Sequence, residues 1–462
     1  MPIALWDESR LAVNAAEMLN NGNWLVTHFD GKPDLWNAKP PLLIWIQASL
    51  FWLFGMNEVT LRLPSALAGL ATAGLLAWFG VRVLRSPLVG LFSALVLLTT
   101  SGYIDRHITR TGDYDTLLVF FTTWYVLSFY RYLEEGHRRS LWHTGIGITL
   151  AILTKSVVGA FFLPALLLYT IATRKLLPLL RQRDFYIMAA GILVAVALYY
   201  VPREFVSPGY WQAVYDNELG GRLGKSEIGL VSTWTWYLDM LIQDELLPWL
   251  YVYPIGFFAL LHPAAPPKYR RLALLLVICV AFLLTVISYS ATKYFWYEAP
   301  IYPLCALVAG AGLAVIAEVI VTHLRAGSRP WAVILFIVCV FAWPAKIIWD
   351  ECFYNEYESD TLFGKYIRHQ AKEYGQIDSY TLLTGLGYDS SMLFSRLAAM
   401  REYDHTVRVL YYWQILDLRQ GETVIVCNPK MRTQVDSLFQ TNAVFEESPC
   451  ATLLLLAPKV NR

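Results

Sequence analysis

The sequence predicts a polytopic α-helical membrane protein with a small α/β domain at its C-terminal end. Of its 462 residues, 56% are hydrophobic and only 16% are charged, and the mean hydropathy of +0.43 is high for a soluble domain. The formal net charge of +1 excludes a global attraction to nucleic acid or to an anionic surface. Any function that depends on charge must therefore be local.

About ten apolar segments have the length and composition of membrane spans, since a helix crosses the hydrocarbon core with about 20 mostly apolar residues. Turn residues or charges flank each of them. The expected spans are residues 59–83, 88–103, 116–133, 141–153, 157–172, 185–201, 245–261, 272–289, 298–321 and 331–349.

Lysine and arginine gather in alternate loops, and short basic loops stay in the cytoplasm. The opposite side then receives residues 7–57, the loop at 105–115, the long loop 202–244, the region of Lys293 and the tail. The basic loops contain Arg82 and Arg85, then Arg131, Arg138 and Arg139, then Arg174, Lys175, Arg181 and Arg183, then Lys268, Arg270 and Arg271, then Arg325 and Arg329.

This orientation places Trp6 outside the cytoplasm with only five residues before it. No basic, apolar and cleavage regions of a signal peptide are visible there. We therefore expect a first span to be missing from this chain, through a mis-set start or a truncation.

After residue 349 the apolar runs become short and polar stretches separate them, which indicates a soluble domain. We predict a membrane domain at 1–350, with an external catalytic loop and interfacial helices at 7–57, and a soluble domain at 351–462. Alternating strands and helices favour a small α/β layer fold. The predicted strands are 380–384, 407–412, 423–427 and 451–456, and the predicted helices are 391–401 and 431–439.

The tail also holds three of the six cysteines, Cys352, Cys427 and Cys450. Their spacing is not that of metal ligands. We interpret them as packing residues, with one disulfide within the tail as the alternative.

Two charged groups near the start of the chain are candidates for chemistry. Asp7 and Glu8 open an amphipathic helix at 9–20, and Lys39 precedes two prolines and a tryptophan-rich apolar segment typical of a membrane interface. The structural alternative for the acids is that they complement the positive end of the helix. The alternative for Lys39 is that it extends toward lipid headgroups.

Further charges are expected in the same outer layer. Asp113 and Asp115 stand at the head of a predicted span, where two unpaired carboxylates would be costly, so ion pairs with Arg106 or Arg110 are the structural alternative. Lys155 and Lys293 lie between apolar runs on the same side. Together these residues would place carboxylates and cations in one outward-facing layer.

That layer fits glycosyl transfer from a sugar phosphate. A carboxylate would deprotonate the acceptor hydroxyl as it attacks the anomeric carbon from the face opposite the phosphate. Lysine and arginine would stabilise the charge that grows on the departing phosphate, most strongly where water is scarce. Direct displacement of this kind would invert the anomeric centre.

A series of motifs in a fixed order carries a family resemblance. The motifs are DESR at 7–10, EML at 17–19, GNW at 22–24, KPPL at 39–42 and RLPSAL at 62–67. The chain resembles the GT-C glycosyltransferases of the protein mannosyltransferase type, in particular the bacterial branch similar to the aminoarabinose transferase of lipid A. The resemblance is close over residues 6–303 and looser beyond them.

The resemblance implies a GT-C fold, a polyprenyl phosphate sugar donor such as an undecaprenyl phosphate sugar, and a lipid, glycan or protein hydroxyl as acceptor. It implies a multi-pass protein of the inner membrane with a periplasmic C-terminal domain. By the resemblance, Asp7 and Asp115 match the family's acids, with Asp113 the less likely match, and Lys39, Lys293 and Tyr297 match residues of the donor site. We take Asp7, Asp115 and Glu8 as the candidate catalytic residues. The candidate substrate-binding residues are Lys39, Arg10, Arg62, Arg110, Asp113, Lys155, Lys293 and Tyr297.

One departure concerns the residue before the lysine of the KPPL motif. Relatives of the lipid A branch usually carry a glutamate there, and this chain has Ala38. The substitution weakens the case for a divalent metal at that position, and no other cofactor is expected. It also weakens the case for lipid A as the substrate.

Two other classes of function remain as alternatives. A transporter or flippase of lipid-linked sugars should show an inverted repeat or paired broken helices, and the sequence shows neither. A non-catalytic sensor or scaffold predicts no clustering of Asp7, Lys39, Asp115 and Lys293.

Overall fold

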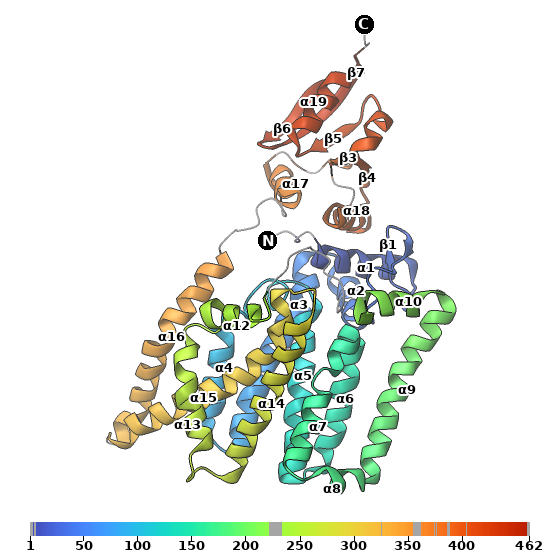
Figure 1. Ribbon diagram of the computed structural model, residues 1–462. Helices are drawn as coiled ribbons and strands as arrows, with labels where there is room; N and C mark the ends of the chain where they lie inside the picture. Colours follow the sequence, from blue (N-terminus) through green and yellow to red (C-terminus); the bar gives the residue numbers. More distant parts are fainter. Residues whose placement is uncertain are drawn as a thin grey trace. The chain divides into compact units, whose positions relative to one another are not determined.

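The computed structural model describes residues 3, 6–220, 233–324, 326–353, 362–373, 375, 377–385, 389–402 and 404–459, and Figure 1 shows its helices and strands. The chain forms two compact units. The helix unit contains Leu35–Leu43 and Leu63–Tyr354, and the sheet unit contains Met1–Asp34, Ile44–Arg62 and Asn355–Arg462. This division is discontinuous in sequence, so our domain bounds of 1–350 and 351–462 stay a prediction.

The helix unit is built from long apolar helices joined by short turns. Local signals explain their ends: Ser86 caps α4 by accepting a hydrogen bond from the Val89 amide at 3.3 Å, and Gly136 ends α5 in the left-handed conformation at φ 66°. Its α-helices are α3 (Glu58–Phe79), α4 (Pro87–Leu98), α5 (Tyr114–Glu135), α6 (Arg138–Lys155), α7 (Leu163–Ala172), α8 (Leu176–Leu180), α9 (Arg183–Val206), α10 (Tyr210–Val214), α12 (Trp236–Met240), α13 (Tyr253–Leu261), α14 (Pro267–Tyr289), α15 (Tyr302–Thr322) and α16 (Arg329–Phe353).

Short 3-10 and π segments complete the helix unit. They continue or precede the long helices at points where the chain bends. These segments are η1 (Gly80–Leu84), η2 (Ser156–Ala160), η3 (Tyr215–Gly220), η4 (Leu241–Glu245), η5 (Trp249–Val252), η6 (Phe295–Ile301) and η7 (Ala326–Ser328).

Six helices of the described residues are long and apolar enough to cross a membrane, so the chain is a multi-pass membrane protein. The other four predicted spans are helices too, but α4, α7 and α13 are shorter and α5 is rich in tyrosine and threonine. Residues 221–232 of the predicted loop 202–244 lie outside the described residues. The six helical segments are Glu58–Leu84, Arg138–Ala160, Arg183–Val206, Pro267–Tyr289, Phe295–Thr322 and Arg329–Phe353.

Small residues allow the central helices to approach each other closely. A Cβ atom at Gly256 of α13 would overlap the carbonyl oxygen of Val308 in α15, and one at Gly310 of α15 would overlap Ser93 of α4. Glycine at such crossings brings two backbones into van der Waals contact, which is how membrane helices gain packing energy without a hydrophobic driving force.

The sheet unit contains a five-stranded sheet of order β4-β3-β5-β7-β6. Strand β3 (Ser379–Thr384) runs parallel to β4 (Thr406–Tyr411) and β5 (Thr423–Val426), whereas β7 (Cys450–Pro458) runs antiparallel to β5 and to β6 (Phe439–Glu447). A disulfide joins Cys427 to Cys450. The α/β fold predicted for the tail is therefore confirmed.

Helices cover both faces of this sheet. Helix α19 (Pro429–Leu438) and η9 (Tyr412–Asp417) pack on one core around Val424 and Leu453. Helices α17 (Leu362–Glu373) and α18 (Ser390–Glu402) pack on the other core around Leu382. Apolar side chains at both faces explain why the central strands are nearly all buried.

The N-terminal segments of the chain complete the sheet unit. Helix α1 (Asp7–Asn21) packs on α18, with the hydroxyls of Ser9 and Ser390 2.5 Å apart. Phe51 of α2 (Leu42–Phe54) packs against Phe394 with ring centroids 5.7 Å apart. The short strands β1 (His28–Phe29) and β2 (Lys32–Pro33) form a separate antiparallel pair. The loop predicted at 7–57 therefore folds into two helices and a small hairpin.

Candidate functional site

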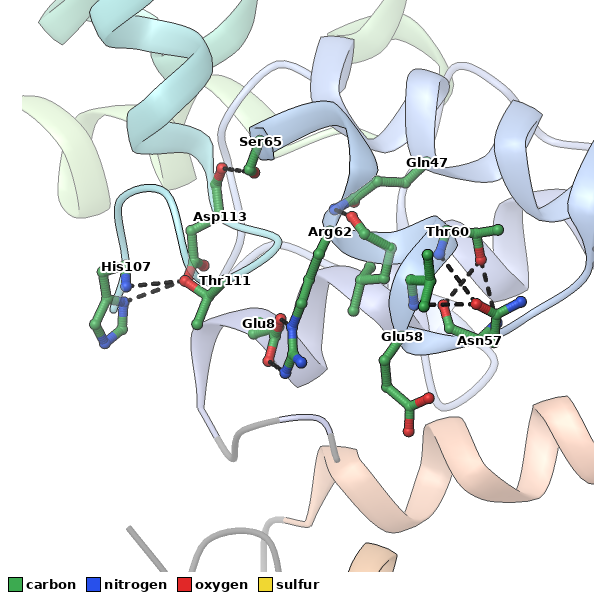
Figure 2. Close-up of polar contacts among 12 residues, drawn as sticks. Glu8, Gln47, Asn57, Glu58, Thr60, Arg62, Ser65, His107, Thr111 and Asp113 are labelled. Atoms are coloured by element: carbon green, nitrogen blue, oxygen red, sulfur yellow. Dashed lines mark hydrogen bonds and ion pairs between the residues drawn. The ribbon is translucent and has the colours of Figure 1, made fainter. Parts of the chain in front are cut away.

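The head of α5 carries two of the predicted acids in different environments. Asp113 precedes the helix and is 3% exposed, and its Oδ2 accepts a hydrogen bond from Thr111 Oγ1 at 2.6 Å. His107 Nδ1 lies 3.5 Å from the same oxygen, and its ring stacks on Trp296 at 3.9 Å. Figure 2 shows His107, Thr111 and Asp113 turned toward one another.

Asp115 forms a buried ion pair with Lys155. The Nζ of Lys155 lies 2.6 Å from Asp115 Oδ1, and both side chains are at most 7% exposed. Lys155 is the last residue of α6, which ends because Ser156 has a φ of 52°. Lys155 also lies 5.8 Å from the ring centroid of Tyr297. Ion pairs with Arg106 or Arg110 were the structural alternative for the acids of this helix, and the partner of Asp115 in this pair is the lysine of the neighbouring helix.

Lys39 lies in a second buried group of the helix unit. Its Nζ is 3.3 Å from Glu218 Oε1 and 5.6 Å from the ring centroid of Tyr114. Asn37 Nδ2 donates to the Tyr114 hydroxyl at 3.0 Å, and the Tyr210 hydroxyl donates to the carbonyl of Ala38 at 2.8 Å. The loop that carries Lys39 is therefore held from α5, α10 and η3.

The remaining predicted residues of the helix unit lie at two places. Tyr297 belongs to η6 and packs edge-on against Tyr294, with centroids 5.4 Å apart; Lys293 is half-buried in the segment just before η6. Arg110 donates from Nη2 to the carbonyl of Cys352 at 3.3 Å. The ring of Tyr297 therefore lies beside the ion pair of Asp115 and Lys155, on the side of the lysine.

The predicted residues of the sheet unit form two arginine–carboxylate pairs. Arg62 donates to both oxygens of Glu8, at 2.6 and 2.8 Å, as Figure 2 shows. Arg10 donates to both oxygens of Asp34, at 2.6 and 2.9 Å. A bidentate pair of this kind fixes the relative orientation of the two side chains in addition to pairing their charges.

Asp7 is the exposed first residue of α1. Its neighbour Glu8 is only 1% exposed. The two adjacent acids therefore differ in their access to solvent, and Asp7 is the one that a reactant can reach.

Sequence reasoning missed several residues of these groups. Tyr114 and Asn37 adjoin predicted residues in the sequence, and that proximity was the available signal. Glu218 and Tyr210 gave no signal, because their contacts with residues 38 and 39 join positions more than 170 residues apart. Glu298, which is fully buried and accepts a hydrogen bond from Tyr302 at 2.8 Å, was also missed.

The helix unit therefore holds two lysines, each beside one carboxylate and one aromatic ring, in surroundings from which water is largely excluded. Charges interact more strongly there than in bulk water. An anionic group that entered would meet cations whose positions are already fixed. This arrangement suits the binding of a phosphate and the stabilisation of negative charge on it.

Comparisons with known proteins agree with this chemistry. Residues 38–200 match the family model of dolichyl-phosphate-mannose-protein mannosyltransferases. The undecaprenyl phosphate-alpha-4-amino-4-deoxy-L-arabinose arabinosyl transferase of Pseudomonas savastanoi pv. phaseolicola is 30% identical over 336 residues, which cover 70% of this chain and 58% of the relative. The enzyme of the same name from Erwinia tasmaniensis is 29% identical over 262 residues, covering 54% and 45%.

The chain thus spans about half the length of the curated relatives that it matches. Its fold is similar to the crystal structure of ArnT from Cupriavidus metallidurans bound to undecaprenyl phosphate. The TM-score is 0.71 at 17% sequence identity, and the match covers 98% of this chain and 94% of that one.

The membrane helices, the small C-terminal sheet and the sequence motifs all agree with the fold expected from the sequence. The family model and the curated relatives confirm the resemblance that the motifs indicated. The chain is therefore similar in sequence to glycosyltransferases that use a polyprenyl phosphate sugar, and it has the fold of the solved ArnT structure.

Proposed function

We propose that this protein is an inverting membrane glycosyltransferase that moves a sugar from a polyprenyl phosphate to a hydroxyl group outside the cytoplasm. The observation that carries the proposal is the 30% identity over 336 residues to a transferase whose donor is an undecaprenyl phosphate aminopentose. By that likeness the donor is an undecaprenyl phosphate sugar, the membrane is the inner membrane, and the sheet unit is periplasmic. The acceptor is a lipid such as lipid A, another envelope glycan or a protein side chain.

The lysines of the helix unit are assigned to the donor phosphate. Lys39 binds it directly in this proposal, supported by its partly buried position beside the buried Glu218. Lys155, fixed by Asp115, adds positive charge where the phosphate departs. Asp115 serves to hold the lysine, because its Oδ1 lies 2.6 Å from the ammonium group.

Asp7 is the proposed base. Its exposed place in the first turn of α1 leaves it open to an acceptor hydroxyl. A phosphate is a good leaving group, so no strong acid is needed to assist its departure. Both oxygens of Glu8 accept hydrogen bonds from Arg62, so its contribution is to hold the first turn of α1.

The other residues are assigned supporting roles in substrate binding. Arg10 orients the loop at Asp34, and Tyr297 and Lys293 line the donor site beside Lys155. Asp113 and Arg110 order the loop before α5.

The test uses purified protein in lipid nanodiscs with a panel of radiolabelled undecaprenyl phosphate sugars and a membrane extract as the acceptor source. We expect label to move from carrier to acceptor, and Asp7→Asn to abolish transfer without loss of folding. Asp417→Asn, which changes an exposed acid of η9, is the matched control and should transfer normally.

Two results would contradict the proposal. Label that stays on the carrier across the whole panel would reject the transferase and favour transport of lipid-linked sugars. Full turnover by Asp7→Asn would reject this residue as the base while leaving the transferase standing.

A further inference from the structure

Arg203 is a buried charge in a helix whose other side chains are mostly exposed or half-buried. Helix α9 has the length and hydropathy of a membrane span, and only 11% of its most apolar window is buried. The buried residues of α9 are Met188, Tyr199 and Arg203, and Arg203 is 0% exposed. An ionisable side chain at such a place is costly to keep and indicates a function.

The guanidinium group meets no well-aligned hydrogen-bond acceptor among the described residues, although the Tyr199 side chain lies close to it. Nε, Nη1 and Nη2 of Arg203 are all buried, and none has an acceptor with hydrogen-bond geometry in this part of the chain. Its main contact is with Tyr210, whose ring centroid lies 4.6 Å from the guanidinium carbon. Tyr199 is close enough to interact electrostatically.

The contact between Arg203 and the ring of Tyr210 offsets only part of the free-energy cost of burying the guanidinium charge. Desolvated cation–π contacts contribute about 2 kcal/mol, while each buried charge without a counterion costs several kcal/mol. The burial of Arg203 is therefore not explained by the stability of α9 alone.

Tyr210 connects this charge to the loop of Lys39. Its ring packs edge-on against Tyr199 with centroids 6.1 Å apart, so arginine and tyrosine together fix the plane of the ring. The hydroxyl then donates to the carbonyl of Ala38 at 2.8 Å. Ala38 immediately precedes Lys39, so the position of Tyr210 sets the backbone from which the lysine extends.

The charged groups of this region differ in how closely a counterion approaches them. Lys39 has Glu218 as its counterion at 3.3 Å, whereas the carboxylate of Glu204 interacts with Arg203 electrostatically but makes no hydrogen bond to its guanidinium group. A sugar phosphodiester carries one negative charge. An extra cation next to the loop of Lys39 would therefore favour that anion over a neutral lipid.

We propose that Arg203 is a positioning residue for donor binding: it holds Tyr210 so that Tyr210 fixes Ala38 and Lys39, and its charge favours the donor phosphate. The inference rests on the proposed function, because it takes Lys39 to be the phosphate ligand. Arg203 does not touch the donor in this scheme.

The experiment compares Arg203→Met, Arg203→Lys and Tyr210→Phe with the wild type in nanodiscs. One assay measures the affinity for undecaprenyl phosphate, and another measures donor KM and kcat. We expect Arg203→Met to raise the Kd for undecaprenyl phosphate and the donor KM at least tenfold, with kcat within about threefold of the wild-type value. The lost interaction stabilises the phosphate equally in the bound donor and in the transition state, so its removal affects KM and not kcat. Arg203→Lys should recover part of the loss, and Tyr210→Phe should raise KM by about two- to tenfold, as expected for one lost hydrogen bond.

Arg183→Met is the matched control. It removes an exposed arginine at the opposite end of the same helix, and it should leave both donor affinity and kcat unchanged.

The outcomes separate the two proposals. Lost affinity for undecaprenyl phosphate in Arg203→Met supports the inference even if the wild type transfers no sugar, in which case only the proposed function fails. Unchanged Kd and KM in a folded Arg203→Met protein, or a fall in kcat at constant KM, would overturn the inference. If Arg203→Met does not fold, unchanged donor affinity in Tyr210→Phe would overturn it instead.

Discussion

Asp115 and Lys155 form an ion pair whose two side chains are at most 7% exposed. Removing one partner leaves an uncompensated buried charge, which costs about 3–5 kcal/mol in other proteins. The outer ion pair of Lys346 and Asp350 differs in its environment, because both of its side chains are more than half exposed. The two pairs therefore provide a comparison between buried and exposed charge.

We predict that Asp115→Asn lowers the thermal midpoint in nanodiscs strongly, while Asp350→Asn changes stability by less than about 1 kcal/mol. The double variant Asp115→Asn with Lys155→Met should recover part of the loss, since it removes the orphaned cation. Equal effects of the two single variants on the melting curve would contradict this account.

Glu134 makes stability depend on pH. It directly follows the predicted span 116–133 and accepts hydrogen bonds from Tyr169 at 2.7 Å and from Arg271, while Lys175 lies 2.8 Å away. Burial acts to raise the pKa of Glu134, but the hydrogen bonds from Lys175, Arg271 and Tyr169 outweigh it, so the pKa is lowered. An acid with a lowered pKa stabilises the fold above its usual pKa, and this contribution disappears as pH falls through the folded value.

We therefore predict that Glu134→Gln destabilises the protein at neutral pH and matters progressively less below the usual glutamate pKa of about 4.3. Melting temperatures of the variant and the wild type, measured between neutral and acidic pH, check this. If the difference in melting temperature between the variant and the wild type is the same at every pH, then altered packing, and not the lost charge, accounts for the lower stability of the variant.

At the residue level the sequence identified the charged positions but not all of their partners. Lys39 and Asp115 were predicted from motifs and from their place at the head of a span. Glu218 could not be predicted as the partner of Lys39, because their contact depends on how α9, α10 and η3 bring the chain back to the loop of Lys39. Arg203 was overlooked since one arginine near the end of an apolar run is usually a membrane anchor.

Among the elements, close helix crossings offer a test of packing. A Cβ atom at Gly256 would overlap the backbone of α15, whereas Gly191 of α9 has open space around it. We predict that Gly256→Ala lowers the thermal stability and that Gly191→Ala does not, because alanine without a clash stabilises a helix by up to about 1 kcal/mol. Unchanged stability in Gly256→Ala would show that the crossing is loosely packed.

Long apolar helices and buried strands were the elements that the sequence predicted best. The strands β3, β4, β5 and β7 matched because their side chains are apolar and β-branched. Strand β6 was missed: it is an edge strand with mostly exposed side chains and two irregularities in its pairing, so no alternating pattern marks it. The helix predicted at 431–439 ends at Leu438, where this strand begins.

For the whole molecule, the distribution of basic residues predicts which parts face the cytoplasm. Arg139 and Trp413 are both exposed, and they should lie on opposite sides of the membrane. We predict that Trp413→Cys reacts with a membrane-impermeant maleimide once the outer membrane is permeabilised, whereas Arg139→Cys reacts only after cell lysis. The exposed Cys339 and Cys352 should first be replaced by serine, and the reverse labelling would invert the proposed topology.

The discontinuous sheet unit has a consequence for biosynthesis. Ser9 meets Ser390 across 381 positions, and the amide of Met56 donates to Glu402 across 346 positions at 3.0 Å. A ribosome needs on the order of tens of seconds to make that length of chain. During that interval the segment with Asp7 lacks its partners on α18, so the proposed base is fully ordered only when translation is nearly complete. A polypeptide released early would carry the membrane helices without this support.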